Sequence, residues 1–273
     1  MLNIGRFLRL FPEAMYMSSK KVKVGIAGLG RSGWGIHAGL LEPMSRKYSV
    51  SGVFDRDRER MKEAEERFGC RTHASLRSLI NQQDIDLMVV ATPNKLHAGH
   101  SIEAMKAGKH VVVEKPMATS LKDADRMIAC SKRTGKYLTV FQNRRYDASF
   151  VRVKKVIDSG VLGRIVMVRI GGYNFSRRWD WQTLKKHKGG TLNNTGPHVI
   201  DQALQLFGKG SPGVFCIREK ALTLGDAEDH VKLTLYGRSA PSVEVEVSSA
   251  CAYGQDNWLV MGTLGGLHGT LKN

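Results

Sequence analysis

"VKVGIAGLGRSGWG", residues 22–35, joins an apolar run to three glycines in GxGxxG spacing. The apolar run predicts a buried strand, and the glycines predict a tight turn from that strand into a helix. The first glycine permits the turn, the second lets the backbone approach a pyrophosphate, and the third lets the helix pack closely on the strand. The sequence therefore predicts a dinucleotide-binding loop formed by Gly28, Gly30, Arg31, Ser32 and Gly33.

Asp55 lies where a second strand, predicted at residues 49–55, ends. A carboxylate at this position binds the 2′-hydroxyl of a ribose and repels a 2′-phosphate, so NAD is the expected cofactor. Arg56 follows directly and could bind such a phosphate, so NADP remains an alternative.

The order of apolar runs predicts two domains. Strands expected at 22–28, 49–55, 86–91, 110–114 and 137–142 alternate with helices, which indicates a doubly wound parallel Rossmann domain over residues 21–143. From residue 144 to 273, strand-like runs are separated by turns, with two helices, one near 148–159 and one beginning within 189–204. This pattern predicts an α+β domain with a mostly antiparallel open sheet. Residues 1–20 are expected to be a disordered extension, not a signal peptide.

Composition sets limits on the function. The 273 residues include 42% hydrophobic residues, enough for a sizeable core, but no apolar run of the roughly 20 residues that span a bilayer. The four cysteines have no paired spacing, so neither a metal site nor a disulfide framework is predicted, and buried thiols in the cytoplasm are expected.

The net charge is +17, and residues 141–200 contribute twelve Lys or Arg against three Asp or Glu. A solvated basic surface is the simplest interpretation, and an anionic substrate is the second. Nucleic acid is not an expected partner, because no zinc-finger spacing or RNA-binding aromatic motif accompanies the charge.

Three further segments point to a family: "ATPNKLHAGH" at 91–100, "VVVEKPMA" at 111–118 and "GGTLNNTGPHVID" at 189–201. With the glycine loop, they make the chain resemble the glucose-fructose oxidoreductase and inositol dehydrogenase family (Gfo/Idh/MocA) from about residue 21 onwards. The resemblance implies a homo-oligomer, dimer or tetramer. Because members are usually longer, we expect either that the protein is naturally short or that the second sheet is incomplete at its C-terminal end.

The resemblance assigns roles to residues of these segments. The first segment covers the cofactor with Thr92, Pro93, Asn94 and His97. The Glu-Lys-Pro segment adds two cofactor-binding residues, Glu114 and Lys115, with the lysine also reaching the substrate and the bond before the proline often cis. His198 is implied to lie near the reacting hydroxyl, and Asp201 one turn further along the same face.

The chemistry of a secondary alcohol agrees with two of these roles. Hydride transfer to a nicotinamide requires a base for the hydroxyl proton, and general base catalysis contributes roughly 10² to 10⁴ in rate. His198 is the expected base. Lys115 is expected to stabilise the oxygen as it becomes negative.

One position departs from the family. Many members carry an aspartate where this chain has Asn194. An amide stabilises an imidazolium less than a carboxylate does, which leaves open whether His198 or Lys115 takes the proton.

Two basic and aromatic segments, residues 142–147 and 176–190, precede the histidine segment. Trp181 could stack on a sugar ring and Arg145 could bind a carboxylate, although a basic surface loop is an equal alternative. The expected substrate-binding residues are therefore Lys115, Arg145, Trp181, Asn194, His198 and Asp201.

The leading functional prediction is an NAD(P)-dependent dehydrogenase or reductase of a sugar, cyclitol or polyol that could carry an acid group. Two alternatives remain open: a glycosidase or lyase that uses transient oxidation by NAD, and a non-catalytic regulator that senses the dinucleotide. Lys115 and His198 favour catalysis.

Overall fold

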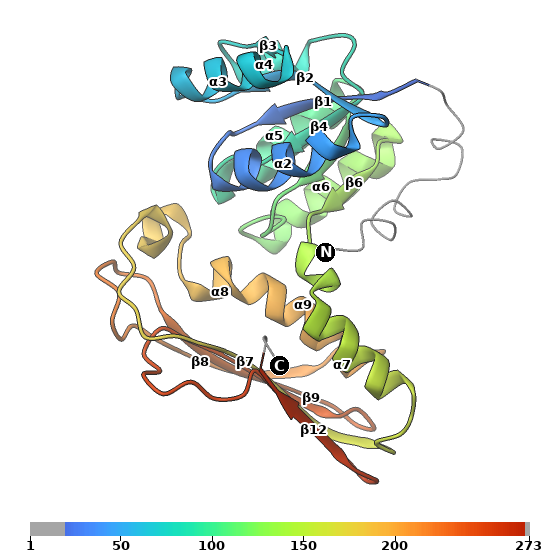
Figure 1. Cartoon of the computed structure of the whole chain (residues 1–273), viewed down its shortest axis with the longest axis vertical. Helices are drawn as coiled ribbons and strands as arrows, with labels where there is room; N and C mark the ends of the chain where they lie inside the picture. Colours follow the sequence, from blue (N-terminus) through green and yellow to red (C-terminus); the bar gives the residue numbers. More distant parts are fainter. Residues whose placement is uncertain (1–19, 271–273) are drawn as a thin grey trace. The chain divides into compact units, whose positions relative to one another are not determined.

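The computed structural model describes residues 20–270, which divide into two units, 20–141 and 142–270. Each unit carries one six-stranded sheet (Figure 1). The extension predicted over residues 1–20 lies almost entirely outside the described residues. Among those described, no helix has the length and apolar character needed to cross a membrane.

The first unit is the doubly wound domain that the sequence predicts. Its strands pair in parallel throughout, in the order β3-β2-β1-β4-β5-β6. The central strands are buried runs of branched residues, as expected when both faces of a parallel sheet are covered. Their bounds are β1 (Val22–Ala27), β2 (Tyr48–Phe54), β3 (Arg71–Thr72), β4 (Leu87–Val90), β5 (His110–Val113) and β6 (Leu138–Val140). The two-residue β3 was not predicted.

Helices cover both faces of this sheet, and one apolar cluster lies on each side. Two helix ends follow directly from the sequence: Gly69 ends α3 in the left-handed region at φ 61°, and the Ser120 hydroxyl caps α6 by accepting the N–H of Asp123 at 3.1 Å. The helices are η2 (Arg31–Ala38), α2 (Gly39–Leu41), η3 (Glu42–Met44), α3 (Arg58–Phe68), α4 (Leu76–Ile80), η4 (Asn94–Leu96), α5 (His97–Lys106) and α6 (Leu121–Thr134).

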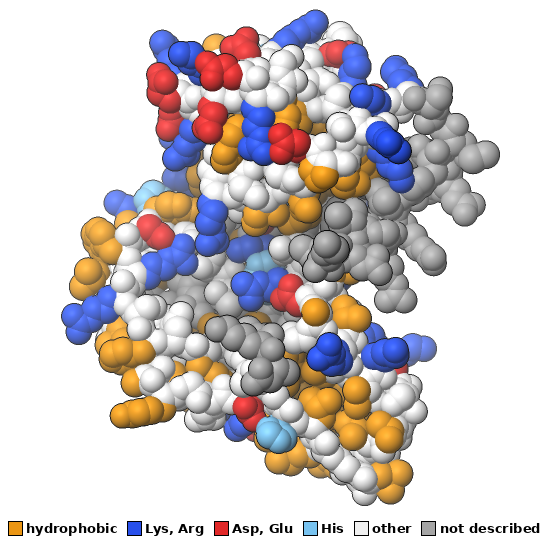
Figure 2. Space-filling model, in the orientation of Figure 1, with side chains coloured by type: hydrophobic (Ala, Val, Ile, Leu, Met, Phe, Trp, Pro, Cys, Tyr) orange, Lys and Arg blue, Asp and Glu red, His pale blue; other side chains and the backbone are white. Residues whose placement is uncertain are grey.

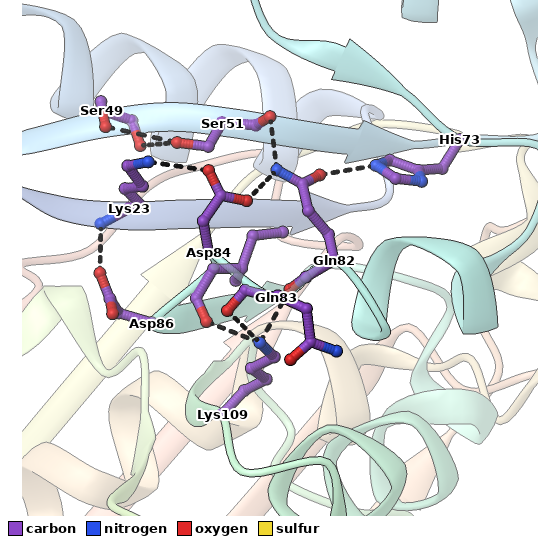
Figure 3. A network of polar contacts seen from close by, with 10 residues as sticks. Lys23, Ser49, Ser51, His73, Gln82, Gln83, Asp84, Asp86 and Lys109 are labelled. Carbon is purple, nitrogen blue, oxygen red and sulfur yellow. Dashed lines mark hydrogen bonds and ion pairs between the residues drawn. The ribbon is translucent and has the colours of Figure 1, made fainter.

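A polar network fastens the amino ends of the strands (Figure 3). Lys109, 6% exposed, donates from Nζ to the carbonyl oxygens of Gln82 and Ile85 at 2.8 Å and of Gln83 at 3.3 Å. Asp84 accepts from Lys23 in the same network. Because this end of the sheet carries structural contacts, the opposite, carboxyl end is available for a ligand.

Lys109→Met is expected to lower the free energy of unfolding by about 3 kcal/mol, because three backbone carbonyls lose a buried charged donor. Urea unfolding measures the change. Lys106→Met is the matched control, since Lys106 is exposed at the end of α5. Equal values for the two variants would show that the three contacts contribute no stability.

The second unit contains a mixed sheet in the order β12-β11-β7-β10-β9-β8. Four of its five pairings are antiparallel, and β7 with β10 is the parallel exception. The strands are β7 (Ile165–Tyr173), β8 (Gly213–Glu219), β9 (His230–Tyr236), β10 (Ser242–Ser248), β11 (Trp258–Gly262) and β12 (Gly266–Gly269). The prediction of a mostly antiparallel sheet is confirmed.

Helices α7 (Ala148–Asp158) and α9 (Gly196–Phe207) lie on one face of this sheet, and the described chain places no helix on the other (Figure 1). Alternate residues of β7, β9 and β10 pack against the helices in one apolar cluster. Edge strand β8 lies beyond this cover, so six of its seven residues are exposed. The expectation that the cysteines are buried is therefore wrong for Cys216 in β8, whereas Cys70 and Cys130 are buried.

Candidate functional site

The glycine loop has the backbone geometry that its spacing predicts. Gly28 has φ 93°, and a Cβ there would lie 2.5 Å from the carbonyl oxygen of Ala91. A Cβ on Gly33 would overlap the carbonyl oxygen of Gly28. A Cβ on Gly30, in contrast, would meet no described heavy atom within 4 Å. The loop therefore packs tightly against strand and helix but leaves space at Gly30, which fits the approach of a pyrophosphate.

Asp55 is fixed beside this loop. Its carboxylate accepts the N–H of Leu29 at 2.5 Å and the N–H of Asp57 at 2.9 Å. These bonds hold the negative charge at the carboxyl end of β2, next to the turn after β1. Arg56 and Arg31 are exposed, whereas Ser32 is partly exposed at the start of η2.

His97 joins two loops at the same edge of the sheet. Its ring nitrogens lie 2.7 Å from the carbonyl oxygens of Thr92, after β4, and of Pro116, after β5. The residue is 1% exposed, and burial lowers the pKa of the imidazole, while the two carbonyls and Glu114 act in the opposite direction. Asn94 is buried and Pro93 exposed in the intervening loop. His97 thus positions the loop that carries Lys115.

Glu114 is buried on the other side of Lys115. Its carboxylate contacts Nε2 of His37 at 3.0 Å and accepts the N–H of Lys115 at 3.1 Å. Burial alone would raise the pKa of Glu114, but the contacts with His37 and Lys115 outweigh it and lower the pKa. The Lys115–Pro116 bond is cis, as the resemblance implies. Lys115 itself is partly exposed. The backbone around Lys115 is therefore held from two sides.

In the second unit, His198 lies in the first turn of α9 and is 8% exposed. The short helix α8 (Thr191–Asn194) precedes it, and Glu228 fastens its start. The carboxylate of Glu228 accepts the N–H of Leu192 at 3.1 Å, and its carbonyl oxygen accepts the N–H of Thr191 at 2.9 Å. Gly190 has φ 101°, and a Cβ there would overlap this carboxylate. Glu228 therefore sets where the histidine segment begins.

A cavity of about 320 Å³ opens within the second unit, beside α8 and the ends of β7 and β10. Its volume is near the lower end of the range for small-molecule sites. Amide and hydroxyl side chains dominate the lining, among them Asn174, Gln182, Asn194, Thr195 and Asn257. Such groups match the hydroxyls of a sugar or polyol.

The residues predicted to bind substrate do not all reach this cavity. Asn194 lines it, whereas Arg145, Trp181, His198 and Asp201 of the same unit do not. Asp201 instead forms a bidentate ion pair with Arg145, at 2.7 and 2.5 Å. Trp181 is 40% exposed. Sequence reasoning omitted Arg144 and Glu228 from the site, although both line the cavity. The charge-rich "QNRRYD" segment was the only signal for Arg144.

Asp229 stabilises the loop that forms one wall. Its carboxylate accepts the N–H groups of Ala221, Leu222 and Thr223 at 2.6 to 2.8 Å. Burial alone would raise the pKa of Asp229, but the three donors outweigh it and lower the pKa. The stabilisation is therefore present above the unfolded-state pKa, near 4, and is lost as the pH falls through the lower folded-state value.

Asp229→Asn is expected to lower the free energy of unfolding at neutral pH by about 2 kcal/mol, because an amide replaces one carboxylate oxygen with a donor that faces other donors. The difference from wild type should shrink as the pH falls below about 4. Urea unfolding at several pH values measures it. A difference that does not depend on pH would contradict the role of the ionised carboxylate.

Comparison with known proteins places both units in one family. Residues 22–142 match the GFO_IDH_MocA model, described as an oxidoreductase family with an NAD-binding Rossmann fold, and residues 150–268 match the GFO/IDH/MocA C-terminal domain. The NADP(+)-dependent scyllo-inositol 2-dehydrogenase of Bacillus subtilis is 34% identical over 80% of this chain and 60% of its own length. A chlorinated carboxy-dihydroxycyclohexadiene dehydrogenase of Comamonas testosteroni is 32% identical over 69% of this chain and 48% of its own length.

Solved structures agree. The WlbA dehydrogenase of Bordetella pertussis, in complex with NADH and UDP-GlcNAcA, matches with a TM-score of 0.82 and 29% identity over 92% of this chain and 74% of that chain. The chain spans about half to two thirds of the length of its first curated relatives. The expected dinucleotide cofactor is confirmed for the family, which is described as NAD-binding. With a matching model in each unit, the chain belongs to the Gfo/Idh/MocA family of oxidoreductases.

Proposed function

We propose that the protein is an NAD(P)-dependent oxidoreductase that transfers a hydride between the nicotinamide and a secondary alcohol or ketone of a sugar, cyclitol or related polyol. One observation carries the proposal: the glycine loop, Asp55 and the loop that carries Lys115 follow the parallel strands β1, β2 and β5 at the carboxyl edge of one sheet. Ligands of doubly wound folds bind at this edge. The names of the dehydrogenase relatives support the same reaction class.

The chain's residues supply binding and proton transfer, while a bound nicotinamide accepts or donates the hydride. Gly30 would leave room for the pyrophosphate, and Asp55 would bind the ribose. Lys115 places a positive charge where the substrate oxygen becomes negative. His198 takes the hydroxyl proton during oxidation and returns it during reduction. Asn194 hydrogen-bonds a substrate hydroxyl from the cavity wall.

NAD is the preferred cofactor in this proposal. The Asp55 carboxylate is fixed by two backbone donors, so a 2′-phosphate at that edge would face a negative charge that does not move away. Comparing kcat/KM for NAD and NADP tests this preference. A higher value for NADP would assign the phosphate to Arg56 or Arg31 instead.

A screen of polyols, sugars and sugar acids with both cofactors tests the function. Steady appearance of reduced cofactor that depends on one of these substrates is the expected result. Cleavage of a glycoside without net reduction of the cofactor would favour the glycosidase alternative. Tight NAD binding without turnover of any substrate would favour the regulator.

Two properties of the whole protein complete the proposal. The uncovered face of the second sheet and the exposed edge strand β8 support a homo-oligomer. Free thiols at Cys70, Cys130, Cys216 and Cys251 support a reducing, cytoplasmic setting. Sedimentation at several protein concentrations tests the first of these.

A further inference from the structure

Charge alone does not identify an anion site in this protein. Lys and Arg side chains are spread over the visible faces of both units, without one continuous stripe (Figure 2). The partners of each arginine near the cavity are therefore more informative than the basic composition of residues 141–200.

The arginines at the cavity differ in their partners. Arg145, outside the lining, is held by Asp201. Arg178 lines the cavity but donates to Asp180 at 2.7 Å and to the amide oxygen of Gln182. Arg144 also lines it, and its side chain forms no ion pair or hydrogen bond with residues 20–270. Asp147 is near enough to interact electrostatically, without forming an ion pair.

The two acidic lining residues are already engaged. Asp229 accepts three backbone N–H groups, and Glu228 accepts the N–H of Leu192. With Arg178 also engaged, Arg144 is the charged lining residue that the described chain leaves available to a ligand. Because only one cation of the lining lacks an acidic partner within the described chain, the wall suits one negative charge better than two.

The backbone of Arg144 is fixed. Gln202, 5% exposed on α9, donates from Nε2 to the carbonyl oxygen of Arg144 at 2.7 Å. Gln202 follows His198 by four residues, one turn along the same helix. The hydrogen bond from Gln202 therefore holds the backbone of Arg144 against α9, the helix that carries the proposed base His198.

We propose that Arg144 binds a carboxylate of the substrate, so that the protein acts on a polyol or sugar that carries a single acid group. This inference rests on the proposed function and assigns the substrate class of the same site. The planar guanidinium pairs with a carboxylate through two parallel hydrogen bonds. The hydroxyl and amide groups of the wall then bind the remaining hydroxyls.

Isothermal titration in the presence of NAD tests the proposal with three probes of one skeleton: glucuronate, glucose and glucose 6-phosphate. We expect wild type to bind glucuronate most tightly. Arg144→Gln should weaken glucuronate binding about 10- to 100-fold, with glucose binding unchanged, because a charge-assisted bidentate pair is lost. Arg144→Lys keeps the charge but not the planar pair of donors, so it should retain part of the affinity. Arg152→Gln, an exposed arginine of α7 outside the lining, is the matched control and should bind like wild type.

Several results would overturn the assignment: glucuronate binding that survives Arg144→Gln, equal or tighter binding of the phosphate, or no binding of glucuronate. An unchanged urea midpoint of Arg144→Gln shows that the variant is folded. Turnover is measured separately. If glucuronate binds through Arg144 but no screened substrate is turned over, only the proposed function is contradicted. If neutral polyols are turned over but glucuronate does not bind through Arg144, only the proposed acid group of the substrate is contradicted.

Discussion

Replacing Lys115 with alanine is expected to lower kcat by about 10² to 10⁴, with NAD affinity changed far less. The backbone at this position is held by Glu114 on one side and by His97, through Pro116, on the other. These contacts are made by the backbone atoms of Lys115 and Pro116, which an alanine at position 115 keeps. The expected loss of kcat then reflects the positive charge that we propose beside the substrate oxygen. Turnover of a substrate found in the screen, together with a titration of NAD, measures both effects.

Lys122→Ala is the control for this experiment, because Lys122 is an exposed lysine of α6. His198→Ala, measured in parallel, should lower kcat to a similar degree if the two residues act on the same proton transfer. Normal turnover in Lys115→Ala would remove Lys115 from the site. A large loss of NAD affinity would instead make it a cofactor-binding residue.

The residues at the carboxyl edge of the first sheet could be predicted because their structure depends on residues close to them in the sequence. Gly28 and Gly33 stand at positions where the backbone or its neighbours leave no space for a side chain, and the strand before them ends in four buried residues. The edge strands β3 and β12 were not predicted. They contain two and four residues, none of them buried, so they show no alternation of apolar and polar residues in the sequence.

The wall of the cavity could not be predicted in the same way. Arg144 and Arg145 are adjacent arginines that the sequence alone cannot distinguish. They differ in the structure because Arg145 forms an ion pair with Asp201, 56 residues away. Glu228 likewise acts on a segment 36 residues before it. Such partners depend on how helices pack on the second sheet, which no local spacing encodes. Sequence reasoning therefore named Arg145 as the substrate-binding arginine, whereas its neighbour Arg144 lines the cavity.

Gly33→Ala is expected to lower the free energy of unfolding by about 2 to 3 kcal/mol and to weaken NAD binding strongly. The new methyl group would overlap the carbonyl oxygen of Gly28. Gly28 has little freedom to move, because its N–H donates to the carbonyl oxygen of Phe54 at 2.8 Å and a Cβ there would lie 2.5 Å from the carbonyl oxygen of Ala91. The overlap must therefore push η2 away from β1 or distort the loop. Urea unfolding and a fluorescence titration with NAD measure the two effects.

Substitutions at two other glycines, Gly30 and Gly35, distinguish an effect on stability from an effect on NAD binding. Gly30→Ala meets open space and has φ −69°, which alanine adopts readily, so stability should change by less than about 0.5 kcal/mol. Its methyl group would nevertheless occupy the space left for the pyrophosphate, so NAD binding should weaken. Gly35→Ala, also in open space but further along η2, should change neither stability nor binding greatly. If Gly30→Ala bound NAD as tightly as wild type, the pyrophosphate would have to bind elsewhere, and the cofactor role of the loop would be refuted even if Gly33→Ala unfolded easily.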